Sequence, residues 1–237
     1  MRPKIVCHMM SSIDGRLLAD RWTKPPADFD ARGLRALYDE AVAKHKAEGW
    51  IVGRKTMEPY AKGVARASAK RSLDRRSTYV ADRKGRDVAV DTHGRLHYGQ
   101  DHAGGDHLIA ILGEQVPDSY LGELREDGVS YVFASPDGED LRRAMETLNE
   151  SFGLTKLLLE GGGLINGSFL KAGLIDEISL LIYPGIDGLA GAPSTFEYVG
   201  DPDERPAEGL SLRQIATETL EGGMAWIRYV VEKAIDA

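Results

Sequence analysis

The chain has 237 residues, of which 42% are hydrophobic and 28% are charged, a balance that excludes a disordered or fibrous protein. The formal net charge of −7 argues against nucleic acid as a partner, because binding to a phosphate backbone requires an extensive basic surface. Cys7 is the only cysteine, so no intramolecular disulfide can form and a cysteine-based metal site is not expected.

The first predicted strand covers residues 4–10. Its apolar run is interrupted by His8 and is too short for a signal peptide. In the rest of the sequence, no segment approaches the roughly 18 consecutive apolar residues of a membrane-spanning helix. We therefore expect a soluble, cytoplasmic protein that has no membrane partner.

After this strand, apolar runs rich in β-forming residues alternate with helical patterns, which predicts an α/β fold with a mainly parallel central sheet flanked by helices. Apolar residues at three- and four-residue spacing over residues 34–45 indicate the first helix. Further strands are predicted at residues 50–52, 108–112, 131–134, 156–159 and 177–182, and further helices at residues 120–125, 141–148 and 164–172.

The C-terminal part has a different pattern. Residues 210–217 and 224–231 are strand-like and are separated by Glu221, Gly222 and Gly223, which predicts an antiparallel hairpin. Residues 185–206 are rich in Gly, Pro and Asp and are expected to form a long loop, because one hairpin cannot stand alone as a domain. We therefore expect a single domain over residues 1–237.

A basic stretch begins at Lys62 and ends at Arg86. Such a run usually forms a solvated surface, and a collar for an anionic ligand is the alternative that the sequence leaves open. The histidines at positions 93, 97, 102 and 107 lie in a polar stretch that is expected to be solvated, so no metal site is predicted. His8 is expected in the core or at the edge of a crevice.

The most informative motif joins a buried strand to a helix. The strand at residues 156–159 is followed by the carboxylate of Glu160 and then by Gly161, Gly162 and Gly163. Glycines let the backbone approach a ligand closely, and the free N–H groups at a helix start attract an anion such as a pyrophosphate. Tight packing of the turn is the alternative, because the motif lacks the spacing of the Rossmann and P-loop fingerprints.

A second turn suited to anions follows the strand at residues 50–52. Gly53, Arg54, Lys55 and Thr56 are placed where an open α/β sheet has its ligand crevice, outside the carboxyl ends of the strands. Arg and Lys bind phosphate well, and two such turns in one sheet favour a dinucleotide. An arginine in this position can also read the 2′-phosphate of NADPH. Without the glycine-rich motif, these side chains would be taken as solvated.

The Ser-Ile-Asp-Gly turn after the first strand and the Leu-Leu-Glu-Gly-Gly-Gly motif together resemble the reductase domain of the bifunctional deaminase-reductases of riboflavin synthesis. The order and spacing of the motifs agree over nearly the whole chain. The family has the dihydrofolate-reductase fold, is usually homodimeric, and uses NADPH to reduce the ribosyl group of 5-amino-6-(5-phosphoribosylamino)uracil to ribityl. The resemblance implies that the three glycines, with Leu164, Ile165 and Asn166, hold the pyrophosphate.

The resemblance also implies roles for three polar residues. Glu160 would face the substrate, and Ser12 and Asp14 would lie near the nicotinamide and the substrate. In the expected reaction, hydride goes to the electrophilic carbon of an imine-like ribosylamine. The proton for nitrogen comes from water, Asp14 or Glu160. Asp-Gly is also a common turn dipeptide, and a purely structural turn is the default interpretation of the Asp14 segment.

Two departures from the family pattern bear on the substrate. The zinc-binding deaminase motif of His-x-Glu followed by Pro-Cys-x-x-Cys is absent, which removes an activity but not the resemblance. The Gly-Arg-Lys-Thr turn looks more like true dihydrofolate reductases, in which a Trp, a Pro and a pterin-binding acid occur where this chain has Trp22, Pro25 and Asp28. Asp28, or Asp30, has a second explanation as the cap of the following helix.

Two alternative functions therefore stay open beside the main prediction, which is an NADPH-dependent reductase of a small phosphorylated pyrimidine. The first is a reductase of dihydrofolate or another pteridine. The second is an NADPH-binding protein that does not catalyse a reaction. The predicted C-terminal hairpin is a candidate for the surface of a homodimer, because an exposed edge strand invites pairing.

Overall fold

The computed structural model describes residues 1–24, 31–66, 78–81, 85–91 and 93–233. Asp28 and Asp30, and much of the basic stretch between Lys62 and Arg86, lie outside the described residues. The chain divides into two compact units. The first consists of Met1–Lys4 and Glu48–Leu157, and the second of Ile5–Ala47 and Leu158–Ala237. The single domain expected from the sequence stays a prediction.

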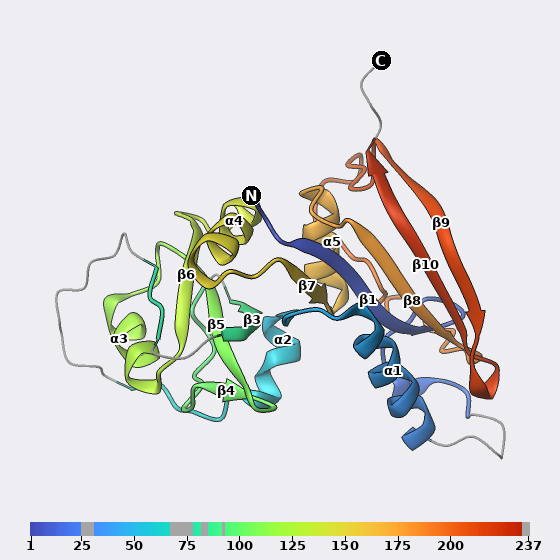
Figure 1. Ribbon diagram of the computed structural model, residues 1–237, viewed down its shortest axis with the longest axis horizontal. Coiled ribbons are helices and arrows are strands. Elements are labelled where there is room, and N and C mark those ends of the chain that lie inside the picture. The colour runs from blue at the N-terminus through green and yellow to red at the C-terminus, as the bar shows by residue number, and fades with distance from the viewer. Residues whose placement is uncertain (25–30, 67–77, 82–84, 92, 234–237) are drawn as a thin grey trace. The chain divides into compact units, whose positions relative to one another are not determined.

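The second unit is built around the pairing of two parallel strands. β1 (Lys4–Ser12) runs beside β8 (Glu177–Tyr183), with Val6 opposite Glu177 and Ser12 opposite Tyr183. On the other side of β8, the antiparallel strands β10 (Ala225–Lys233) and β9 (Leu210–Thr219) follow in that order (Figure 1). The helices of this unit are α1 (Ala31–His45) and α5 (Gly163–Lys171).

The first unit has a parallel set of strands. β2 (Trp50–Gly53) pairs with β3 (Gly85–Val90), which pairs with β5 (Asp106–Gly113), and β5 pairs with β6 (Ser130–Ser135). The short β4 (His102–Ala103) is antiparallel to β5. The remaining elements are the helices α2 (Arg54–Met57), α3 (Asp118–Asp127) and α4 (Leu141–Phe152), with β7 (Lys156–Leu159), along which the chain passes from the first unit to the second.

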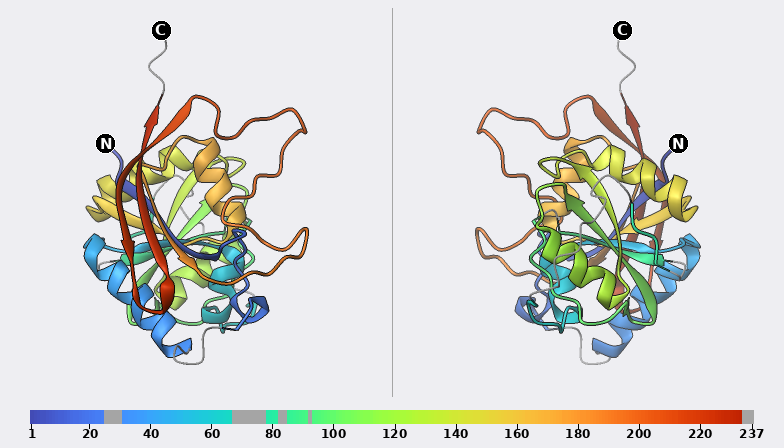
Figure 2. Two further views of the ribbon diagram at one scale, coloured as in Figure 1. Left: turned by 90° about the vertical axis from the view of Figure 1, so that its right-hand side faces the viewer. Right: turned by 90° about the vertical axis from the view of Figure 1, so that its left-hand side faces the viewer.

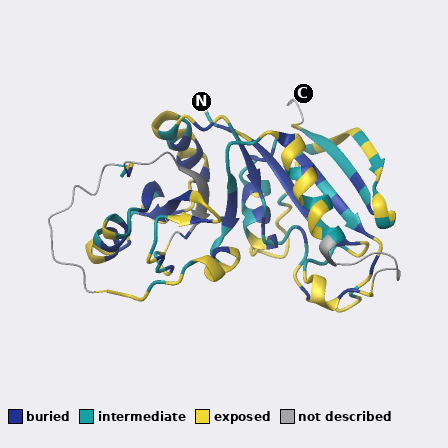
Figure 3. Ribbon diagram, turned by 60° about the horizontal axis from the view of Figure 1, so that its bottom comes forward, coloured by how far each residue is buried: buried dark blue, intermediate teal, exposed yellow. Residues whose placement is uncertain are grey.

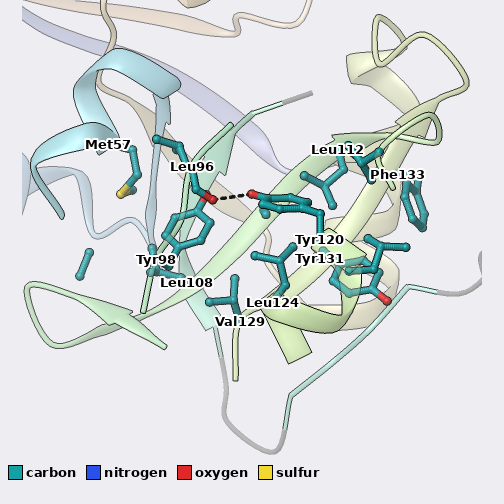
Figure 4. Packing of buried hydrophobic residues seen from close by; sticks show 14 of the residues in the cluster. Met57, Leu96, Tyr98, Leu108, Leu112, Tyr120, Leu124, Val129, Tyr131 and Phe133 are labelled. Carbon is teal, nitrogen blue, oxygen red and sulfur yellow. Dashed lines mark hydrogen bonds between the residues drawn. The ribbon is translucent and has the colours of Figure 1, made fainter. Parts of the chain in front are cut away.

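Burial explains why the parallel strands read as unbroken apolar runs. Every residue of β5 after Asp106 is buried, as expected for a parallel strand that is covered on both faces. Leu108, Ala110 and Leu112 of β5 belong to a cluster in which the Tyr120 hydroxyl donates to the backbone oxygen of Leu96 at 2.7 Å (Figure 4). By contrast, β9 is intermediate or exposed along its whole length (Figure 3).

The second unit has a core that includes polar groups. Trp22, Leu181, Tyr183 and Trp226 are buried together, and the partly buried Tyr38 of α1 packs against them. Beside them, the Ser179 hydroxyl contacts Nδ1 of His8 at 2.9 Å, Nε2 of His45 at 3.0 Å and Nε1 of Trp226 at 2.8 Å. Such groups are tolerated in a core because they are hydrogen-bonded. His8 is therefore a core residue, which is one of the two positions expected from the sequence.

The α/β architecture, the mainly parallel pairing and the C-terminal hairpin are confirmed. β7 has the predicted bounds, and the other predicted strands and helices differ from the structure by a few residues at their ends. β3 was not predicted, because its sequence begins with Gly, Arg and Asp. Among the described residues, none of the helices combines the length and hydropathy needed to cross a bilayer.

Candidate active site

Glu160 is the first residue after β7, and its carboxyl group has an unusual environment. Burial raises the pKa of this carboxyl to about 7, although a hydrogen bond from Tyr38 and the charge of Arg35 both oppose the rise. The nearby charge of Asp39 adds to it. Near neutral pH the group is therefore present both as an acid and as a carboxylate, which suits it to give or take a proton.

Asp14 has the opposite environment. Its carboxylate accepts hydrogen bonds from the Ser12 hydroxyl at 2.6 Å, from the backbone N–H of Gly188 at 2.8 Å and from that of Asp187 at 3.2 Å. These bonds, that of Ser12 foremost, lower the pKa of Asp14 to about 2. Asp14 is therefore ionised at neutral pH, and its oxygens hold the turn after β1 against the loop after β8.

The long loop between β8 and β9 is part of the site. Its first half is joined to the turn after β1 by backbone hydrogen bonds from Ile13 to Gly185 (2.9 Å), from Leu17 to Pro193 (3.0 Å) and from Thr195 to Gly15 (3.1 Å). The Arg16 guanidinium adds a bond to the Ala192 carbonyl at 2.7 Å. Figure 2 shows this connection, drawn in orange, as an open path that passes α5. The predicted loop is confirmed, but its attachment to the Asp14 turn was not predicted.

The glycines of the motif have different physical tasks. Gly161 has a φ of +83°, a conformation that favours glycine, and a Cβ at this position would lie 2.7 Å from Cε of Met9, which would have to move. At Gly163, a Cβ would collide with the backbone oxygen of Ser194, so this glycine lets the loop after β8 approach α5. A Cβ on Gly162 meets no atom within 4 Å. Close packing therefore accounts for Gly161 and Gly163, and the binding of a phosphate stays a prediction, for which Gly162 leaves space.

The start of α5 offers N–H groups to a ligand. Gly162 is the N-cap and supplies no side-chain hydrogen bond, and the first N–H groups of any α-helix have no acceptor within the helix. Here they belong to Gly163, Leu164 and Ile165, and Leu164 is exposed. Because the helix dipole adds positive potential at this end, these N–H groups and the open space at Gly162 fit a pyrophosphate.

Asn166, which is expected to help hold the cofactor, contacts the loop after β8. Its side chain is fully buried, and its amide nitrogen donates to the Thr195 carbonyl at 2.8 Å. Asn166 therefore fixes the loop after β8 to the first turn of α5. Within the second unit, the loop after β8 thus contacts both the Asp14 turn and the start of α5 that follows the glycine motif.

Gly53, Arg54, Lys55 and Thr56 lie in the first unit. Gly53 is the N-cap of α2, while Lys55 and Thr56 are exposed. The Arg54 guanidinium forms an ion pair with Glu58, which lies one turn later. These residues follow the carboxyl end of β2, as predicted, and an exposed ion pair of this kind stabilises little. Arg54 is thus able to exchange Glu58 for a phosphate.

Tyr38 is the residue of the site that was not singled out from the sequence. Within α1 it looks like one member of an apolar stripe, since it lies one turn after Leu34 and packs against the same core. Only its effect on the Glu160 pKa, which it lowers, connects it with the site. His107, which was expected to be solvated, is buried and contacts the Ser130 hydroxyl at 2.8 Å, because it lies within β5.

Comparisons with known proteins agree with this geometry. The family model described as the RibD C-terminal domain matches residues 3–226. The 2,5-diamino-6-ribosylamino-4(3H)-pyrimidinone 5′-phosphate reductase of Methanothermobacter thermautotrophicus is 32% identical over 114 residues, which are 47% of this chain and 52% of that protein. The match thus spans about half of the length of this curated relative.

Two solved structures share the fold. A pyrimidine reductase-like protein from Corynebacterium diphtheriae superposes with a TM-score of 0.66 at 17% identity, over 98% of this chain and 92% of the other. RibD from Acinetobacter baumannii superposes with a TM-score of 0.62 at 21% identity, over 98% of this chain and 59% of the other. At these identities the likeness establishes the fold alone.

The packing of the loop after β8 on α5 leads to a prediction for Gly167. A Cβ at this position would collide with the backbone oxygen of Glu197, so Gly167→Ala should displace the loop and destabilise the protein by about 1–3 kcal/mol. Thermal unfolding followed by circular dichroism measures the effect. Ser168→Ala, on the neighbouring residue of α5, is the control and should change the melting temperature little. Equal melting temperatures for the two variants would contradict the packing described here.

Proposed function

The chain belongs to the RibD C-terminal domain family, and on this premise we propose that it is a reductase that uses NADPH to convert the ribosyl group of an aminopyrimidine ribosylamine phosphate to ribityl. The observation that carries this proposal is the position of Glu160, a carboxyl with a pKa of about 7, at the turn that leads into the open start of α5. A proton donor and an anion site thus belong to one turn. The curated relative, whose printed name is that of a reductase acting on such a phosphate, supports the choice of substrate class.

The reaction needs a hydride at carbon and a proton at nitrogen. When bound, the nicotinamide supplies the hydride. Glu160 in its acid form would give the proton to the nitrogen of the imine-like ribosylamine as the carbon is reduced, and would then be left as a carboxylate. Asp14 is a poor donor, because its pKa is lowered to about 2. Its part is to hold the turn after β1 against the loop after β8.

The binding roles follow from the contacts of each segment. The N–H groups of Leu164 and Ile165, with the open space at Gly162, would hold the pyrophosphate, while Gly161 and Gly163 shape the turn. Ser12 would act through Asp14, to which its hydroxyl donates. Arg54, with Lys55 and Thr56 beside it, would hold the 2′-phosphate that distinguishes NADPH from NADH. Arg suits this task because its planar group binds phosphate oxygens in pairs.

A homodimer in the cytoplasm completes the proposal. β9 pairs with β10 along one side only within the described part of the chain, and it exposes Leu212 and Ile215. An edge strand with exposed apolar side chains is suited to pairing with a second copy of the chain.

The proposal is tested by following NADPH oxidation at the nicotinamide absorbance with 5-amino-6-(5-phosphoribosylamino)uracil and, in parallel, with dihydrofolate. We expect turnover of the pyrimidine only, with a kcat that falls as the pH rises through about 7, because Glu160 loses its proton there. Glu160→Gln should lower kcat by about 100-fold or more. Turnover of dihydrofolate alone, or of neither compound, would contradict the proposal.

Cofactor selectivity tests the role of Arg54 separately. Arg54→Gln should raise the KM for NADPH by about tenfold and leave that for NADH unchanged, because only NADPH loses a charge-assisted bond. Arg143→Gln is a matched control, since Arg143 is also an exposed arginine of the first unit and is 3.5 Å from a glutamate, Glu114. If both cofactors are affected equally, Arg54 does not read the 2′-phosphate.

A further inference from the structure

The loop after β8 crosses α5 at two glycines that lie one turn apart. The backbone N–H of Glu197 donates to the carbonyl of Gly163 at 3.0 Å, and a Cβ on Gly167 would collide with the backbone oxygen of Glu197. The main chain of Glu197 is thus held against the first turn of α5, which the proposed function assigns to the pyrophosphate.

The carboxylate of the half-buried Glu197 lies beside the open start of this helix. Its Cγ and Oε2 atoms are 3.1 Å from the position that a Cβ on Gly163 would occupy. Gly163 is the first residue of α5, and a Cα–Cβ bond in an α-helix is tilted toward the N-terminus. A negative charge is therefore placed at the end of α5 that has free N–H groups.

The two oxygens of the Glu197 carboxylate differ in their bonds. Oε1 accepts from the backbone N–H of Ser194 at 3.2 Å, while Oε2 accepts no hydrogen bond from the described part of the chain. The same turn recurs later in this loop, where Oε2 of Glu204 accepts from the N–H of Asp201 at 3.0 Å. There the other oxygen is 2.8 Å from Nζ of Lys171. Glu197 therefore has an oxygen open to a donor, whereas both oxygens of Glu204 are bonded.

The charge and the open oxygen together limit the chemistry of the ligand. A carboxylate beside a bound pyrophosphate is unfavourable unless the ligand also brings hydrogen-bond donors, because like charges repel. A dinucleotide has such donors, since a ribose is attached to each phosphate, and a carboxylate accepts from a ribose hydroxyl in Rossmann-type sites. In NADPH the adenosine ribose carries the 2′-phosphate, which a carboxylate would repel. The nicotinamide ribose keeps both of its hydroxyl groups.

We propose that Glu197 is a specificity-determining residue whose open carboxylate oxygen accepts hydrogen bonds from the hydroxyl groups of the nicotinamide ribose. This inference rests on the proposed function, in which the start of α5 holds the pyrophosphate. Glu197 then favours a ligand with a neutral ribose on the pyrophosphate and repels one that has only a charged phosphate there. The substrate also carries hydroxyl groups near a phosphate, so an experiment has to separate the two ligands.

Binding of NADPH is compared with that of 2′-phospho-ADP, which has the same adenosine phosphates but lacks the nicotinamide ribose. Isothermal titration calorimetry of the full chain without substrate measures both dissociation constants. Glu197→Gln keeps an oxygen for the Ser194 N–H and loses the charge, so the Kd for NADPH should rise by about tenfold. The Kd for 2′-phospho-ADP should fall by about twofold, because its terminal phosphate is no longer repelled.

Glu204→Gln is the matched control, because Glu204 has the same bond to a backbone N–H in the same loop. It should change neither Kd. Equal weakening of both ligands in Glu197→Gln would overturn the inference, because a displaced loop gives that result. An unchanged Kd for NADPH would also overturn it, and a raised KM for the pyrimidine alone would then assign Glu197 to the substrate.

Calorimetry needs no turnover, so the inference and the proposed function can fail separately. The expected pair of opposite shifts without reduction of the pyrimidine would refute the proposed reaction and leave the role of Glu197 standing. Reduction of the pyrimidine, with the same Kd for NADPH in Glu197→Gln as in the unaltered chain, would refute the role of Glu197 alone. If the unaltered chain does not bind NADPH, both are refuted.

Discussion

The turn between β7 and α5 combines a half-buried carboxyl group with a helix start that has no side-chain cap. It holds the Glu160 carboxyl half-buried, which raises the pKa to about 7, and it leaves the start of α5 without a side-chain cap. Each feature is unfavourable for stability, because a half-buried carboxyl resists ionisation and uncapped N–H groups lack partners. Both features are useful at a turn that transfers a proton and binds an anion.

The loop after β8 supports this turn from the other side. Asn166 ties it to the first turn of α5 through Thr195, and Asp14 ties it to the turn after β1 through Asp187 and Gly188. Hydrogen bonds therefore connect the turn after β1, the loop after β8 and the first turn of α5. Such connections fix positions closely, because hydrogen bonds depend on direction as well as distance.

Much of the structure around Glu160 could be predicted, because each residue pattern there has one physical cause. The apolar run before Glu160 and the glycines after it specify a buried strand, a turn and a helix start, and the structure has each of them. From the sequence alone, Asp14 and Glu160 were equivalent candidates for the proton donor. The pKa of each depends on surroundings that only the folded structure shows. The backbone hydrogen bonds of Gly15 and Gly185 could not be predicted, because they involve no side chain. Tyr38 belongs to an apolar stripe of α1, and this pattern does not indicate what its hydroxyl contacts.

We propose that the cofactor phosphates bind at the turn between β7 and α5 that also carries Glu160. A titration of NADPH into the nitrogen-15-labelled chain, followed by the backbone amide signals, tests this proposal. We expect saturable shifts of the Gly162, Leu164 and Ile165 signals, because their N–H groups lie at the proposed pyrophosphate site. Saturable binding that leaves these three signals unchanged while others move would contradict it.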